Sequence, residues 1–193
     1  RLDPATGREV PFPDGRSKHT IAEWDLLKDG AAKKWDGWTR EHRAHDADWL
    51  GINPQGLAAL DGMLYVGLHF NDKLLKIDAA AGEVAGEISL PDPAGLASDG
   101  KRLLAISGRR VVEVHPADGT ASPVIDEGLA APVELTVDGR GRIFVSDWAD
   151  QMCVKVFSPK GAFLRTVGKP GGRAWQGPYD ASGMLMPLGI AVD

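Results

Sequence analysis

The stretch PVELTVDGRGRIFVSDWADQMCVKVFSPKGAFLRTVG, residues 132–168, contains four short apolar runs separated by turns. The runs cover residues 134–138, 142–147, 153–158 and 163–168. Asp-Gly between the first two runs is typical of a β-hairpin, because glycine accepts the positive φ that a tight turn requires. The runs are too short for helices, so the stretch predicts four β-strands.

The same pattern occurs twice more, upstream of this stretch. PQGLAALDGMLYVGL from Pro54 and PAGLASDGKRLLAISG from Pro93 align with the stretch from Pro132, and successive prolines are 39 residues apart. Four strands repeated at a period of about 40 residues are the signature of a β-propeller blade. We therefore predict an all-β fold, a β-propeller built from four-stranded antiparallel blades.

The repeat also sets the predicted domain boundaries within a single propeller segment, residues 1–193. In chain order these are the outer half of a blade (1–13), a Trp-rich insertion (14–52), three blades (53–91, 92–131 and 132–168), a Gly-rich inserted loop (169–186) and the first strand of the next blade (187–193). A propeller closes its ring to remove exposed strand edges. We expect a ring of about six blades, completed by the rest of the same longer chain; completion by another chain is the alternative.

Composition and charge exclude two classes of partner. The net charge of −5 offers no basic face for counterion release, which argues against nucleic-acid binding. No run approaches the roughly 18 apolar residues needed to span a bilayer, so we expect no membrane span. For localisation, our working assumption is a secreted or periplasmic protein rather than a cytoplasmic one.

Residues 132–168 resemble an NHL repeat, with its proline, apolar strand, Asp, Gly, second strand ending in Asp, and final Gly. PLGIAVD, at 187–193, is similar to the usual opening of that repeat. The sequence departs from the family pattern at Met152, near the position where an arginine is usual, and at Glu134, where the other copies have glycine. The resemblance implies a propeller and does not by itself imply a ligand.

Candidate binding residues lie where the repeat is interrupted, since loops on a rigid scaffold concentrate binding residues. Trp35 and Trp38 in the first insertion could stack on sugar rings; the alternative is that the tryptophans fasten the insertion to the blades. In the Gly-rich loop, Arg173 stands near Trp175 and Tyr179. An arginine beside an aromatic ring can hold a carboxylate or stack on a flat ligand, and an ordinary cover between blades is the alternative.

Glu134 is the candidate catalytic residue, because it brings a carboxylate into an inner strand that should line the central channel. Enzymes of the gluconolactonase group, which resemble NHL proteins in architecture, hold a divalent metal there with carboxylates and an asparagine. That resemblance implies a divalent cation such as calcium, with Glu134, Asn53 and Asp147 as ligands. His42 and His45 form a separate candidate, since both would share one helix face. A water-solvated Glu134 and a solvated histidine turn are the alternatives.

Three functions remain open at this point. The first is a binding module whose insertions on one face recognise a protein or a carbohydrate. The second is a metal-dependent hydrolase or lyase that acts over the central channel. The third is a purely structural repeat within a large multidomain chain.

Overall fold

The computed structural model describes residues 5, 6 and 54–192. That part of the chain contains three four-stranded antiparallel sheets. Blade 1 comprises β1 (Pro54–Leu60), β2 (Met63–Leu68), β3 (Lys73–Asp78) and β4 (Val84–Ser89), with a 3-10 turn, η2 (His69–Asn71); blade 2 comprises β5 (Pro93–Ser98), β6 (Leu103–Ser107), β7 (Arg110–His115) and β8 (Thr120–Ile125); blade 3 comprises β9 (Pro132–Val137), β10 (Ile143–Asp147), β11 (Cys153–Phe157) and β12 (Phe163–Val167). The predicted fold class and the four-strand repeat are confirmed.

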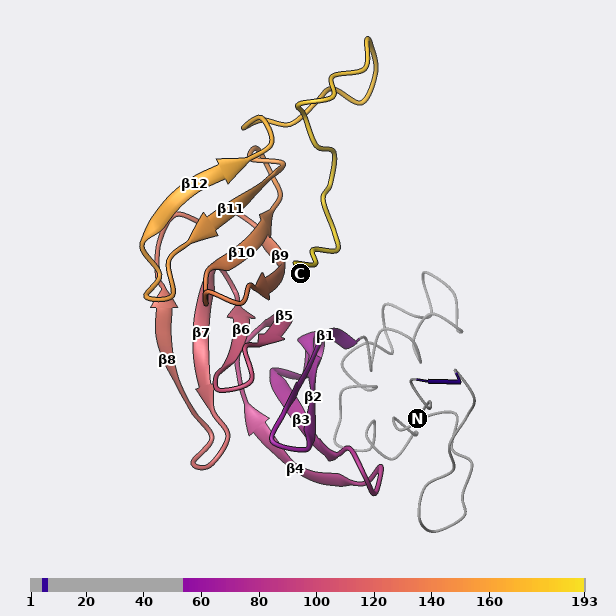
Figure 1. Ribbon diagram of the computed structural model, residues 1–193, viewed down its shortest axis with the longest axis vertical. Coiled ribbons are helices and arrows are strands. Elements are labelled where there is room, and N and C mark those ends of the chain that lie inside the picture. Colours follow the sequence, from indigo (N-terminus) through magenta and orange to yellow (C-terminus); the bar gives the residue numbers. More distant parts are fainter. Residues whose placement is uncertain (1–4, 7–53, 193) are drawn as a thin grey trace, which may run out of the picture.

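The three blades fan out along an arc (Figure 1). The first strand of each blade, β1, β5 or β9, lies on the concave side, and the last strand, β4, β8 or β12, lies on the convex side. β1 contacts β5, and β5 contacts β9, so the inner strands of successive blades are neighbours. No helix in the described part is long and apolar enough to cross a membrane.

The core consists of apolar layers between successive blades. Side chains alternate along a strand, so one strand supplies both of its neighbours. On β6, Leu103 and Ala105 belong to the cluster shared with blade 1, whereas Leu104 and Ile106 belong to the cluster shared with blade 3. All four side chains are fully buried, so the middle blade holds the arc together through both of its faces.

Glycines near the start of the inner strands are structural. A Cβ atom on Gly95 would lie 2.7 Å from Glu134 Cα and 2.9 Å from Leu135 N, closer than real Cβ atoms approach. A Cβ atom on Gly56 would likewise overlap Ala94 O and the adjacent backbone of blade 2. Neighbouring inner strands therefore meet backbone to backbone at these two positions.

Two predicted segments lie at the limits of the described chain. The predicted half blade 1–13, apart from residues 5 and 6, and the insertion 14–52 lie outside the described residues. Residues 187–192 form no strand with any other described residue, so their assignment to the next blade stays a prediction.

Candidate functional site

The two ends of the blades form two distinct faces. One, here called the connection face, carries the inter-blade connections 90–92, 126–131 and 168–186 and the starts of the inner strands. The opposite face carries the β1–β2, β5–β6 and β9–β10 hairpins. Because the inner strands run side by side, residues near their starts gather at one end of the concave side of the arc.

Glu134 lies at this end of the concave side, near the start of β9. It is the third residue of β9, and its Oε2 atom lies 2.8 Å from the position that a Cβ on Gly95 would occupy, so the side chain leans over β5. It lines an open hollow of about 380 Å³ whose other walls are the first residues of β1, 54–57. Glu134 is half-buried, and burial raises the pKa of its carboxyl group. The surface of the hollow is mainly apolar, and the Glu134 carboxylate is partly desolvated in it.

Ser146 and Trp148 form hydrogen bonds with residues 187 and 188, which follow the 168–186 connection. The Ser146 hydroxyl accepts a hydrogen bond from Glu134 N at 3.1 Å and lies 3.3 Å from Leu188 O. Trp148 Nε1 donates to Pro187 O at 2.7 Å. Residues 187 and 188 are thereby held against the inner end of blade 3.

A side chain just after the second strand of each blade reaches the next connection. His69 Nδ1 lies 3.2 Å from Pro93 O and 3.0 Å from an Asp92 carboxylate oxygen. Arg109 donates from Nε and Nη2 to Leu129 O, at 3.3 and 3.1 Å. Together with the contact of Trp148, these contacts, here called clasps, fasten each blade to the chain that enters the next one.

Asp147, predicted as a metal ligand, is completely buried at the end of β10. Its Oδ1 atom accepts hydrogen bonds from Ala130 N at 3.0 Å and Ala131 N at 2.7 Å. Its Oδ2 atom lies 2.7 Å from Lys155 Nζ, which also donates to Gly128 O at 2.6 Å. The carboxylate thus fastens the 126–131 connection to blade 3.

The Gly-rich loop 169–186, here called the arm, has a hydrogen-bonded base. Gly171 N donates to Gln151 O at 2.9 Å, which ties the arm to the β10–β11 turn. Arg173 N donates to Met184 O at 3.1 Å, pairing the two sides of the arm. Gly172 is buried at φ +63°, and a Cβ there would overlap Met184 O and Met152 Cβ. Only glycine fits this joint, so the base of the arm has a defined shape.

The outer part of the arm presents aromatic rings to solvent. Trp175 is 74% exposed and Tyr179 is 77% exposed. The Arg173 guanidinium lies over the Tyr179 ring, with Cζ 5.1 Å from the centroid. Below them, hydrogen bonds from the Ser182 side chain and backbone and from Lys169 lower the pKa of Asp180 to about 2. The arm therefore offers two exposed rings and one positioned cation.

The structure brings only some of the predicted site residues together. Arg173 and Tyr179 are in contact, Trp175 is on the same arm, and Glu134 is on the same face but in a separate hollow. Trp35, Trp38, His42, His45 and Asn53 lie outside the described residues. Among residues 5, 6 and 54–192, no group of three or more His, Cys, Asp or Glu side chains is placed to hold a metal ion.

The clasps were missed at the sequence level, although a signal for them exists. His69, Arg109 and Trp148 all follow the second strand of their copy within two residues, and each carries a side-chain N–H donor. Aligning the copies by strand ends, rather than by the apolar pattern alone, would have shown this shared donor.

Comparisons with known proteins identify the architecture. No protein-family model and no curated protein matches the chain. Among solved structures, it is similar to a nidogen/laminin complex, with a TM-score of 0.52 and 22% identity over 60% of this chain and 48% of that one. A gluconolactonase from Xanthomonas campestris gives a TM-score of 0.51 and 21% identity over 57% and 46% of the two chains. The virginiamycin B lyase from Staphylococcus aureus gives a TM-score of 0.50 and 15% identity over 59% and 41%.

The described chain has the β-propeller fold. It spans about half or less of the length of these propellers. The similar structures include both a binding protein and enzymes, and identities this low establish the fold alone. The NHL resemblance of the repeats stays a prediction.

Proposed function

We propose that the chain is part of a binding propeller whose connection face recognises a protein or a carbohydrate through the arm. The observation that carries this proposal is the pair of exposed rings, Trp175 and Tyr179, on an arm whose base is fixed by backbone hydrogen bonds. Exposed aromatic rings supply contact area at low entropic cost, and binding energy concentrates in such side chains. Trp35 and Trp38 are assigned to the same function, from their sequence alone.

The arm has the chemistry that a sugar or a peptide needs. An aromatic face stacks on the C–H groups of a sugar ring or on an apolar side chain. Arg173 is held over Tyr179, so its planar donors are already oriented for a carboxylate or a hydroxyl. Because the base of the arm is already ordered, less entropy is lost when a ligand binds.

The test is a glycan array and a panel of extracellular-matrix proteins, probed with the full chain. We expect Trp175→Ala and Tyr179→Ala each to weaken a captured ligand by about tenfold or more, as truncation of binding hot spots does. Leu164→Ala is the matched control, because Leu164 is a 51% exposed apolar residue on β12, outside the arm. Equal binding by the wild type and both arm variants would overturn the proposal.

The second candidate is a metal-dependent hydrolase or lyase with Glu134 as ligand or base. It is favoured by one observation, the half-buried carboxylate with a raised pKa in a hollow on the concave side of the arc. The test is a calorimetric titration of Ca²⁺ into the full chain and into Glu134→Gln. Binding that the substitution abolishes would support this candidate, and binding that it leaves unchanged would exclude Glu134 as a ligand.

A further inference from the structure

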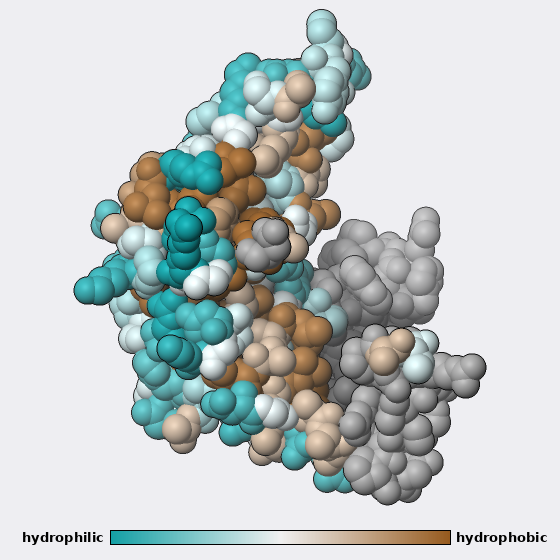
Figure 2. All heavy atoms as spheres, viewed as in Figure 1, coloured by the Kyte–Doolittle hydropathy of each residue, from teal (hydrophilic) through white to brown (hydrophobic). Residues whose placement is uncertain are grey.

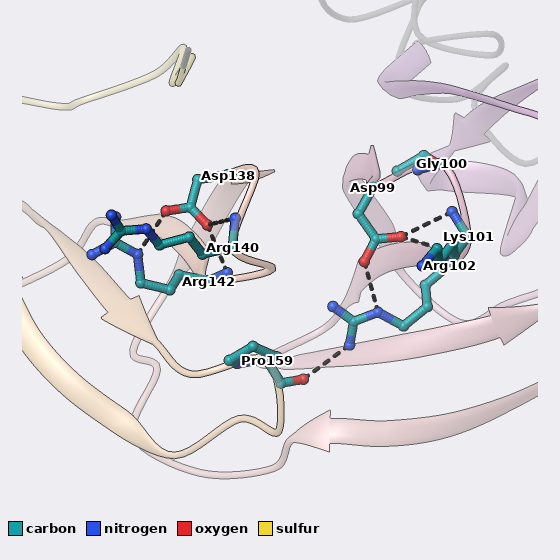
Figure 3. A network of polar contacts seen from close by, with 9 residues as sticks. Asp99, Gly100, Lys101, Arg102, Asp138, Arg140, Arg142 and Pro159 are labelled. Carbon is teal, nitrogen blue, oxygen red and sulfur yellow. Dashed lines mark hydrogen bonds and ion pairs between the residues drawn. The ribbon is translucent and has the colours of Figure 1, made fainter.

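The face opposite the arm carries two hairpin turns with the same internal construction. In the β5–β6 turn, Asp99 Oδ1 accepts hydrogen bonds from Lys101 N at 3.0 Å and Arg102 N at 2.8 Å, and Asp99 Oδ2 accepts from Arg102 Nε at 2.8 Å. The side chains of both turns are shown in Figure 3. Asp99 thus stabilises its turn by accepting hydrogen bonds from two backbone N–H groups and from the Arg102 side chain, an arrangement here called a turn lock.

The β9–β10 turn repeats this lock one blade later. Asp138 Oδ1 accepts from Arg140 N at 3.0 Å and Arg142 N at 2.9 Å, and Asp138 Oδ2 accepts from Arg142 Nε at 2.6 Å. Burial alone would raise the pKa of Asp138, but the hydrogen bonds and charge of Arg142 outweigh it, so the pKa is lowered. The same balance lowers the pKa of Asp99 through Arg102. Both carboxylates therefore stay charged and paired.

Each arginine is fixed by a second contact as well. Arg102 Nη1 donates to Pro159 O at 2.9 Å, which bridges blade 2 to the β11–β12 turn of blade 3 (Figure 3). The Arg142 guanidinium lies over the Phe144 ring, 5.6 Å from the centroid. Their side chains are only 21% and 36% exposed. Both guanidinium groups are therefore oriented before any ligand arrives.

A groove of about 430 Å³ runs between the two turns. Its lining includes Lys101, the two aspartates and the backbone of Gly139. Lys101 is exposed, Arg140 is exposed between the lining residues Gly139 and Gly141, and Lys160 is exposed next to Pro159. Strongly hydrophilic residues gather over the middle of the arc, where blades 2 and 3 meet (Figure 2).

The charge at this groove is opposite to that of the whole chain. The three turns around this groove, 99–102, 138–142 and 158–162, contain two carboxylates, Asp99 and Asp138, and five cations: Lys101, Arg102, Arg140, Arg142 and Lys160. The chain as a whole carries −5. The corresponding turn of blade 1, Asp61-Gly62, contains no cation. The β1–β2 turn of blade 1 thus lacks the positive charge found at the junction of blades 2 and 3.

We propose that this groove binds an acidic segment of a partner polypeptide in an extended conformation. Side-chain carboxylates of the segment would pair with Lys101 and Arg140, which have no carboxylate partner in the described structure. The backbone N–H groups of the segment would face Asp99 and Asp138. A site of this kind is separate from the arm and independent of the function proposed for it.

The two aspartates favour a peptide over a nucleic acid. They are part of the lining, so a polyanion with a phosphate at every step would meet like charge inside the groove. A peptide carries spaced carboxylates and also supplies N–H donors. The space beside Gly139 is open, with no atom within 4 Å of its Cβ position, so a peptide backbone can approach there.

The experiment is a fluorescence-anisotropy titration of the full chain with a labelled short peptide of alternating Glu and Gly. We expect saturable binding that weakens with salt, and a loss of about tenfold or more in Lys101→Glu/Arg140→Glu. Both positions are exposed, and neither side chain takes part in the turn locks, which use their backbone N–H groups. Arg165→Glu is the matched control, because Arg165 is an exposed cation on β12.

Three outcomes would overturn the proposal. The first is no binding of the peptide at concentrations up to about 1 mM, where even weak specific binding would be seen. The second is equal weakening by Arg165→Glu, which would indicate attraction to net charge rather than to the groove. The third is tighter binding of an oligothymidylate of the same charge, which would assign the groove to nucleic acid. Circular dichroism of each variant checks that the fold is unchanged.

Discussion

Replacing Asp147 by asparagine tests whether the buried carboxylate of blade 3 is structural. The aspartate is completely buried and pairs with Lys155, whose side chain is only 12% exposed. Asparagine keeps the size, and its Oδ1 atom can still accept from Ala130 N and Ala131 N. Its Nδ2 group then faces the Lys155 ammonium, which is left with Gly128 O alone. Removing one member of a buried ion pair costs about 3–5 kcal/mol.

The assay is urea unfolding of the full chain, followed by tryptophan fluorescence. With a denaturant dependence of about 2 kcal/mol/M, the midpoint should fall by roughly 1.5–2.5 M. Asp147→Asn/Lys155→Met should be less destabilised than the sum of the two single variants, because no cation is then left unpaired. Arg110→Met is the matched control, since Arg110 pairs with Asp126 at the exposed surface, and it should cost about 1 kcal/mol or less.

Two results would refute this reasoning. An unchanged midpoint in Asp147→Asn would mean that the pair contributes nothing to folding. A midpoint that EDTA lowers in the wild type, but not in Asp147→Asn, would show that the carboxylate holds a metal ion, as the gluconolactonase resemblance implies, and that the lysine contact is secondary.

Two further predictions concern the inner strands. Gly95→Ala should lower the free energy of unfolding by about 1–3 kcal/mol, because the new Cβ meets the backbone of β9. Gly139→Ala is the control and should change the free energy of unfolding by less than about 0.5 kcal/mol, because the space beside Gly139 is open. Urea midpoints measure both effects, and equal effects would contradict the close approach of β5 and β9. Because burial raises the pKa of Glu134 above its ordinary value of 4.5, the folded state is penalised once the pH exceeds that value, so Glu134→Gln should be more stable than the wild type at about pH 7 and equal to it at about pH 3. A wild type that is the more stable protein at neutral pH would mean that the carboxylate has a favourable partner.

The fold could be predicted from the sequence because its determinants are local. A hairpin needs two apolar runs and an Asp-Gly turn within a few residues, and the structure forms such a turn at Asp61 and Gly62, with φ of +50° and +75°. Repetition then amplifies a weak signal, since three copies agree on the same strand order. The strands of blade 3 match the predicted runs to within about two residues at each end, which is the usual difference between assignments of strand ends.

The site was less predictable because its contacts join residues far apart in the chain. Asp147 reaches back 17 residues to Ala130 N, and Arg102 reaches 57 residues forward to Pro159 O. No periodic pattern in the sequence predicts such pairs. From one sequence, a structural aspartate buried at a strand end cannot be distinguished from a metal ligand. The sequence shows that Glu134 replaces the glycine of the other copies. It does not show the direction of the side chain, which depends on the space beside Gly95 in the neighbouring blade.

Blades 1 and 3 carry different residues at one equivalent pair of positions on their first and second strands. Gly56 pairs with Gly67 in blade 1, and Glu134 pairs with Ser146 at the corresponding place in blade 3. A Cβ on Gly67 would lie 3.3 Å from Ala94 O, and the Ser146 hydroxyl lies 3.3 Å from Leu188 O, so serine occupies that space and adds a hydrogen bond to the next segment.

The space available at Gly56 of blade 1 could not hold a glutamate, because a Cβ on Gly56 would overlap β5 of the next blade. The Cβ of Glu134 therefore needs more room on the side of residues 187–192 than Gly56 has on the side of β5. Packing alone would favour glycine at position 134. A half-buried carboxylate there costs stability at neutral pH, and the role proposed for Glu134 as a ligand or base would account for that cost.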